Sequence, residues 1–160
     1  MRMNKLEYIP GDLVMTNGVP LGTAKNVVYR VTSSDPSKTL ELDDGTVLKG
    51  VVRLENIEGA EFGEKGYLFG DCCAWVKDIE PIPITPEILE KNRWKKKMYC
   101  DWCHYLPIEG NILYLSKGIG IDGAFSVDVG KDMSYIASIS FVHQLQHIFF
   151  SLNINHKMEV

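Results

Sequence analysis

The chain has 160 residues, of which 45% are hydrophobic and 24% charged, and its formal net charge is −4. This composition is typical of a globular protein with one domain or two small ones, and it excludes a long disordered chain. The negative balance excludes a general electrostatic attraction to nucleic acid or acidic lipid. No apolar stretch reaches the roughly 18 residues of a membrane span. No apolar signal segment is visible either, so we expect a cytoplasmic protein with reduced cysteines.

Short β-rich segments separated by turn signals fill the first half of the chain. They are GDLVM (11–15), NVVYRVT (26–32), KTLEL (38–42), TVLKGVVRL (46–54) and AWVKDIEPIPI (74–84). Asp44-Gly45 predicts a hairpin between the third and fourth segments. Residues 33–37 and 55–70 are predicted to be irregular. Strands at this spacing favour a small β-barrel or a curled sheet over residues 1–84.

The second half, residues 85–160, opens with a helix start signal and then returns to strands. Thr85 is the predicted N-cap, Pro86 occupies the first helical position, and Asn92 is the predicted left-handed stop. Glycine-separated segments predict an antiparallel meander followed by a long helix, at 94–108, 111–118, 124–129, 133–139 and 141–152. The expected fold class is therefore α+β, mostly β: a barrel-like subdomain, then a short helix, an antiparallel sheet and a C-terminal helix.

The last predicted helix carries the sequence HQLQH at residues 143–147. At 100° per residue its apolar side chains form one stripe, whereas His143 and His147 share the other side. We therefore expect the two histidines and Gln144 to be at least partly exposed, with Phe150 beside them. The stripe is expected to be buried, and it consists of Leu145, Ile148, Phe149 and Leu152.

Two histidines four residues apart are also half of a zinc-protease signature. In that signature a glutamate follows the first histidine and serves as the general base. Gln144 occupies this position and cannot accept a proton, so we assign no catalytic residue and favour a protein without enzymatic activity. A zinc-binding protein or a metal-dependent hydrolase that uses His143 and His147 stays as the alternative hypothesis.

The cysteine pattern CDWCH, residues 100–104, matches a haem-attachment motif and a zinc or redox half-site. A regular strand would point Cys100 and Cys103 to opposite faces, where they could not easily share a metal or a disulfide. The adjacent Cys72 and Cys73 are a poor chelating pair. We therefore expect unligated thiols and no cofactor, although the sequence leaves open whether any cysteine binds a metal.

A basic and aromatic segment, RWKKKMY, begins at residue 93. Lysines flanked by aromatic residues resemble a nucleic-acid-binding surface, and a solvated start of a strand is the alternative. The candidate binding residues are accordingly Trp94, Lys95, Lys96, Lys97, His143, His147 and Phe150.

Two segments, IPITPEILEKNRWKK and ISFVHQLQHIFFSL, resemble an uncharacterised small protein family of Bacteroides-type gut bacteria and their phages and mobile elements. The resemblance covers Ile82 to Lys97 and Ile139 to Leu152. His147 stands where the family usually has asparagine, which implies that the family's helix does not depend on a histidine pair. The segment from Gly11 to Val14 is similar to small SH3-like barrels.

The resemblance brings no activity with it. We expect a non-enzymatic binding or adaptor protein of phage or mobile-element origin that contacts a protein or nucleic acid. We expect no contact with a membrane, and self-association into a homodimer is an alternative to a foreign partner.

Overall fold

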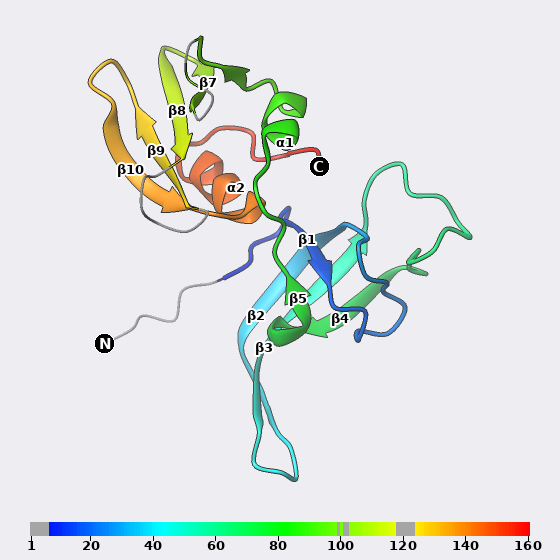
Figure 1. Ribbon diagram of the computed structural model, residues 1–160. Coiled ribbons are helices and arrows are strands. Elements are labelled where there is room, and N and C mark those ends of the chain that lie inside the picture. The colour runs from blue at the N-terminus through cyan, green and yellow to red at the C-terminus, as the bar shows by residue number, and fades with distance from the viewer. Residues whose placement is uncertain (1–6, 99, 101–102, 118–123) are drawn as a thin grey trace. The chain divides into compact units, whose positions relative to one another are not determined.

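The computed structural model describes residues 7–98, 100, 103–117 and 124–160 (Figure 1). The chain divides into two compact units, of which the first comprises Met1–Ile82 with Gln146–Lys157 and the second comprises Pro83–Leu145 with Met158–Val160. Both units are built on antiparallel sheets and helices are few among the described residues, so the protein is α+β and mostly β. None of the described helices has the length and apolar character needed to cross a membrane.

The first unit holds a five-stranded antiparallel sheet in the order β4-β3-β2-β1-β5. A short 3-10 helix, η1 (Val76–Asp78), joins β4 to β5. No ladder joins β4 to β5 among the described strands, so the sheet is open and the predicted barrel is not closed. The strands are β1 (Leu13–Thr16), β2 (Tyr29–Glu41), β3 (Val47–Asn56), β4 (Asp71–Trp75) and β5 (Ile79–Glu80).

The predicted hairpin between β2 and β3 is confirmed. The amide of Leu42 donates to the carbonyl of Thr46 at 2.8 Å, and Gly45 adopts φ 85°, which explains the glycine at this turn. The predicted irregular segment 33–37 is wrong, because β2 runs through it. A register shift between Asp35 and Thr39 accommodates the turn-forming residues as a bulge rather than as a loop.

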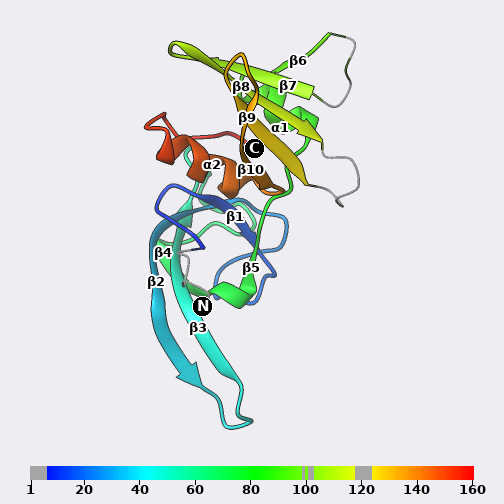
Figure 2. The ribbon, with the colours of Figure 1, turned by 90° about the vertical axis from the view of Figure 1, so that its left-hand side faces the viewer.

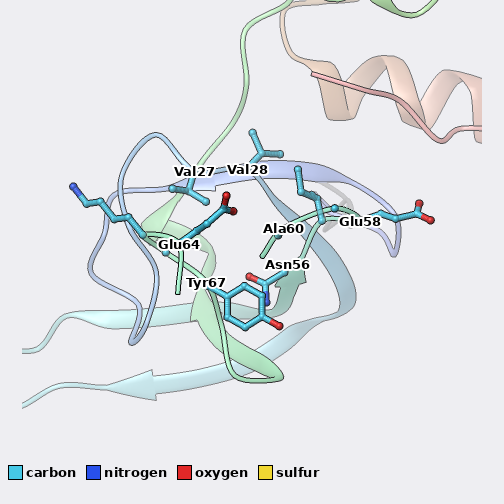
Figure 3. A pocket seen from close by; sticks show the side chains of 11 residues that line it. Val27, Val28, Asn56, Glu58, Ala60, Glu64 and Tyr67 are labelled. Atoms are coloured by element: carbon cyan, nitrogen blue, oxygen red, sulfur yellow. The ribbon is translucent and has the colours of Figure 1, made fainter. Parts of the chain in front are cut away.

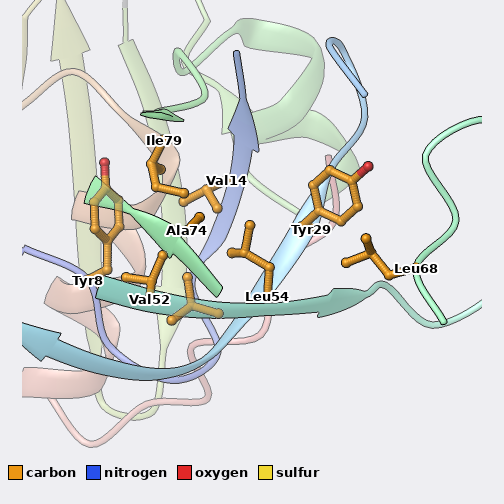
Figure 4. Packing of buried hydrophobic residues seen from close by; sticks show 9 residues of the cluster. Tyr8, Val14, Tyr29, Val52, Leu54, Leu68, Ala74 and Ile79 are labelled. Atoms are coloured by element: carbon orange, nitrogen blue, oxygen red, sulfur yellow. The ribbon is translucent and has the colours of Figure 1, made fainter. Parts of the chain in front are cut away.

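The core of the first unit lies on one face of this sheet (Figure 4). Tyr29, which is fully buried, ties two loops to it: its hydroxyl accepts from the Ala24 amide at 3.0 Å and donates to the Gly66 carbonyl at 2.7 Å. A Cβ on Gly66 would lie 2.6 Å from the Tyr29 hydroxyl, so the close approach of the loops requires glycine. The core residues are Tyr8, Val14, Tyr29, Val31, Val52, Leu54, Leu68, Ala74 and Ile79.

Gln146 joins the C-terminal part of the chain to the first unit. Its fully buried side chain accepts from the Leu13 amide at 2.9 Å, and it donates to the carbonyls of Gly11 at 3.0 Å and His156 at 2.9 Å. These bonds satisfy the amide in a buried position, where an unpaired polar group would be costly. They also explain why residues 146–157 belong to the first unit, which a division of the sequence at residue 84 does not anticipate.

The second unit holds a five-stranded antiparallel sheet in the order β10-β9-β8-β7-β6. It begins with α1 (Pro86–Lys91), where the Thr85 hydroxyl accepts from the Ile88 amide at 3.3 Å, as the capping signal predicts. The left-handed residue after α1 is Arg93, at φ 71°, rather than Asn92, at φ −98°. The strands are β6 (Lys95–Lys96), β7 (Cys103–Ile108), β8 (Asn111–Lys117), β9 (Phe125–Val129) and β10 (Ser134–Ile139).

The final helix, α2 (Val142–Ser151), confirms part of the predicted burial and contradicts the rest. Its stripe is buried at Leu145, Ile148 and Phe149, but Leu152 is 40% exposed because the helix ends at Ser151. His143, predicted to be partly exposed, is only 5% exposed. The prediction assumed that α2 packs on a single sheet, whereas its residues are divided between the two units.

Candidate functional site

The two faces of the sheet in the second unit differ in chemistry. Residues directly opposite one another in an antiparallel ladder point to the same face, and successive residues alternate. One face is the buried one: His104 pairs with Leu115, and Leu115 pairs with Val127. These three residues, with Leu113, are 0–4% exposed. This face is the core of the unit.

The other face carries a row of aromatic and charged residues that crosses all five strands. Lys95 on β6 pairs with Tyr105 on β7, and Tyr105 pairs with Tyr114 on β8. Asp128 on β9 pairs with Tyr114 on one side and with Tyr135 on β10 on the other. We call Lys95, Tyr105, Tyr114, Asp128 and Tyr135 the tyrosine row; Figure 2 shows the strands that carry it.

The tyrosine row is accessible to solvent. Tyr135 is 62% exposed, Lys95 is exposed, and Tyr105, Tyr114 and Asp128 are partly buried. Adjacent strands of a sheet lie about 5 Å apart and strands two positions apart lie roughly 10 Å apart. Tyr105 and Tyr114 stand on adjacent strands, and Tyr135 stands two strands from Tyr114. The row therefore offers flat aromatic surface at Tyr105 and Tyr114, and again at Tyr135.

A second polar row runs beside the first. Cys103 pairs with Ser116, Ser116 with Ser126, and Ser126 with Ser138. The Ser138 and Tyr135 hydroxyls are 2.8 Å apart and share a hydrogen bond. Hydroxyl groups and one carboxylate thus surround the rings, so the face can donate and accept hydrogen bonds as well as stack.

Two of the three lysines predicted to bind belong to this face. Lys97 places its ammonium group 5.7 Å from the centre of the Tyr114 ring, within cation–π range. Lys95 lies in the tyrosine row itself. Lys96 pairs with His104 and therefore points to the opposite face, although it too is exposed.

Trp94 does not lie on this surface. It is 2% exposed, so its ring is not presented to a ligand at the surface. Lys95 and Lys97 nevertheless have aromatic neighbours, because Tyr105 on β7 and Tyr114 on β8 lie beside them. Sequence reasoning missed these tyrosines, since only the register of the ladder shows which residues lie beside Lys95.

The remaining predicted binding residues lie on α2. The ring of His143 stacks on Phe141 at 6.0 Å between centroids, and His143 is buried. His147 is bonded through Nε2 to Asp12 Oδ2 at 2.7 Å. Phe150 is 60% exposed and packs edge-to-face against His156 at 5.4 Å. Both histidines are therefore engaged by other side chains of the protein.

The described residues contain no group of three or more His, Cys, Asp or Glu side chains arranged to hold a metal. The alternative of a zinc site at His143 and His147 therefore gains no support from them.

The four cysteines form no disulfide. The expectation that Cys100 and Cys103 point to opposite faces of one strand is wrong, because β7 begins only at Cys103 and Cys100 lies outside it. Burial raises the pKa of the Cys103 thiol, and burial does the same for Cys72. Both shifts disfavour the reactive thiolate.

Comparison with models of protein families, with curated proteins and with solved structures gives no match.

Proposed function

We propose that this chain is a binding protein whose second unit takes up single-stranded nucleic acid on the tyrosine row. The observation that carries the proposal is the alignment of Tyr105, Tyr114 and Tyr135 across one face, with Lys95 and Lys97 at its β6 edge. Sheets with exposed aromatic rings bind single strands because every base can stack, and nearby lysines contact the phosphates.

The chemistry of the row favours bases over a duplex. A duplex offers phosphates to a broad basic surface, whereas here the cations are confined to one edge and Asp128 lies within the row. A carboxylate at this position repels phosphate but can accept from an N–H group at the edge of an unpaired base. Stacking therefore contributes most of the affinity, and the two lysines add a modest electrostatic term.

The decisive experiment is fluorescence anisotropy of a labelled 15-mer of deoxythymidine and of its uridine equivalent at low and moderate salt. We expect saturable binding by the full chain and roughly 5- to 150-fold weaker binding by Tyr114→Ala, since stacking on one ring contributes about 1–3 kcal/mol. If the protein binds neither oligonucleotide, the proposal is overturned. Unchanged affinity of Tyr114→Ala would also overturn it, because the oligonucleotide would then bind elsewhere.

We further propose that the first unit is similar to a small SH3-like barrel and that the protein originates from a phage or mobile element. The strand order, the 3-10 helix between β4 and β5, and the long connection between β1 and β2 support the first statement. The resemblance of residues 82–97 and 139–152 supports the second. In this view the first unit is free to contact a second partner, as an adaptor requires.

A further inference from the structure

Two loops of the first unit line a cavity of about 310 Å³ that is open to solvent. One loop precedes β2, and the other, residues 57–70, connects β3 to β4. The longer loop is ordered by consecutive turns, in which the amides of Ala60, Glu64 and Tyr67 each donate to the carbonyl three residues earlier. Asn56 then fixes its end, since its side chain exchanges two hydrogen bonds, of 2.7 and 2.8 Å, with the backbone of Leu68.

The same loop exposes an aromatic cluster, formed by Phe62, Tyr67 and Phe69. The three rings pack edge-to-face, with centroid distances of 5.0 to 6.2 Å. Phe62 is 71% exposed and Phe69 is 82% exposed. Phenylalanines that are this exposed on a structured loop leave apolar area that a partner would bury.

The charge of this loop is negative. It carries Glu58, Glu61 and Glu64 against the single cation Lys65. Glu58 is engaged by Lys157 at 2.8 Å. Figure 3 shows the side chain of Glu64 reaching toward Val27 across the cavity, whereas that of Glu58 extends away from it.

The cavity thus combines apolar walls with charged groups. Val27, Ala60 and the ring of Tyr67 line it. Glu58, Glu64 and Lys65 line it as well, and Glu64 is the carboxylate that reaches across it. Its volume is at the lower end of the range for ligand pockets, which suits one long side chain better than a cofactor. A lysine or arginine side chain has the matching form, with an apolar stem and a cationic end.

We propose that this cavity binds a cationic side chain of a partner protein, and that the aromatic cluster packs on the apolar residues that flank it in the partner. The ammonium or guanidinium group pairs with Glu64, and its stem lies against Val27 and Tyr67. Three carboxylates in the loop repel phosphate, so this surface is complementary to a basic protein segment and is separate from the tyrosine row in chemistry.

The test is an NMR titration of the full ¹⁵N-labelled chain with the peptide Gly-Leu-Arg-Leu-Gly, blocked at both ends, and with the same peptide carrying neutral citrulline. We expect amide shifts confined to residues 57–70 and the loop before β2. We also expect the citrulline peptide to bind roughly tenfold more weakly or worse, since a hydrogen bond between charged groups is lost.

Three variants locate the interaction. Glu64→Gln should weaken binding of the arginine peptide about as much as citrulline does, while keeping an oxygen that can accept from the Glu61 amide. Glu61→Gln makes the same change of charge outside the cavity lining and should leave the affinity within about twofold, as expected of an exposed charge. Phe69→Ser should weaken binding with the fold retained.

Shifts of equal size with the two peptides would overturn the proposal, as would equal effects of Glu61→Gln and Glu64→Gln. Binding of an oligonucleotide instead of the peptide at residues 57–70 would also overturn it.

Discussion

The two faces of the sheet in the second unit are made from the same strands, yet they have opposite roles. On one face Leu113, Leu115 and Val127 are fully buried. On the other face, one residue along each strand, Tyr114 and Asp128 keep contact with solvent. The inward face specifies the fold through apolar burial. The outward face does not form this core, so its aromatic rings require another explanation. Ligand binding is the explanation that we propose.

The largest expected effect is the loss of stability caused by a substitution on the inward face. Leu115→Ala should lower the free energy of unfolding by about 2–5 kcal/mol, because burial is lost and a cavity is left. The matched outward change, Tyr135→Ala, should cost about 0.5 kcal/mol or less, as at ordinary surface positions. Urea denaturation of both variants tests the difference. Equal losses of stability would mean that the outward face is also packed.

The next effect concerns affinity on the outward face. Tyr105→Ala should weaken binding of the deoxythymidine 15-mer by about 1–3 kcal/mol, the contribution of stacking on one ring. Tyr105→Phe keeps the ring and should bind like the unchanged protein. Anisotropy titrations measure both variants, with melting temperatures as a control for folding. If the phenylalanine variant binds as weakly as the alanine variant, the hydroxyl group is the contact and stacking is not.

A smaller effect separates the lysines by face. Lys95→Gln combined with Lys97→Gln should flatten the salt dependence of binding, by a slope of about 1.4 if each lysine contacts one phosphate. Lys96→Gln removes the same kind of charge from the opposite face and should leave the slope unchanged. Plots of log affinity against log salt concentration measure this. A larger change of slope for Lys96→Gln would mean that the nucleic acid contacts the inward side of the β6 edge.

The last prediction uses His104, a buried titratable residue of the inward face. Burial lowers its pKa below the ordinary value of 6.5; Lys96 adds to this shift and Glu90 opposes it. The unfolded chain therefore takes up the proton first, so stability should fall as the pH drops below about 6.5, the pKa of an unperturbed histidine, toward the folded pKa.

His104→Leu should remove that part of the pH dependence, because it eliminates the titrating group. Urea denaturation of both proteins between pH 5 and 8 measures the difference. Parallel stability curves would show that His104 is not held neutral in the fold.

Much of the fold could be predicted from the sequence where local signals are strong. The Asp44-Gly45 hairpin and the capping of α1 by Thr85 are local and are confirmed. The buried stripe of α2 follows from periodicity and is confirmed at Leu145, Ile148 and Phe149.

What depends on distant contacts could not be predicted. The buried state of Gln146 depends on backbone groups about 135 positions away, at Gly11 and Leu13. The tyrosine row depends on the register of four ladders, which periodicity alone does not fix. Lys95 and Lys97 could be proposed as binding residues from their charge, but Tyr114 could not be placed beside them.

The central claim is that the outward face binds single-stranded nucleic acid, and an NMR map of the complex tests it most directly. The chain is titrated with the deoxythymidine 15-mer while the aromatic and amide resonances are followed. We expect the largest shifts at Tyr105, Tyr114, Tyr135 and Lys95, small shifts at Leu113 and Leu115, and none in residues 57–70. Unchanged tyrosine resonances at saturating oligonucleotide, or shifts confined to the first unit, would contradict the claim.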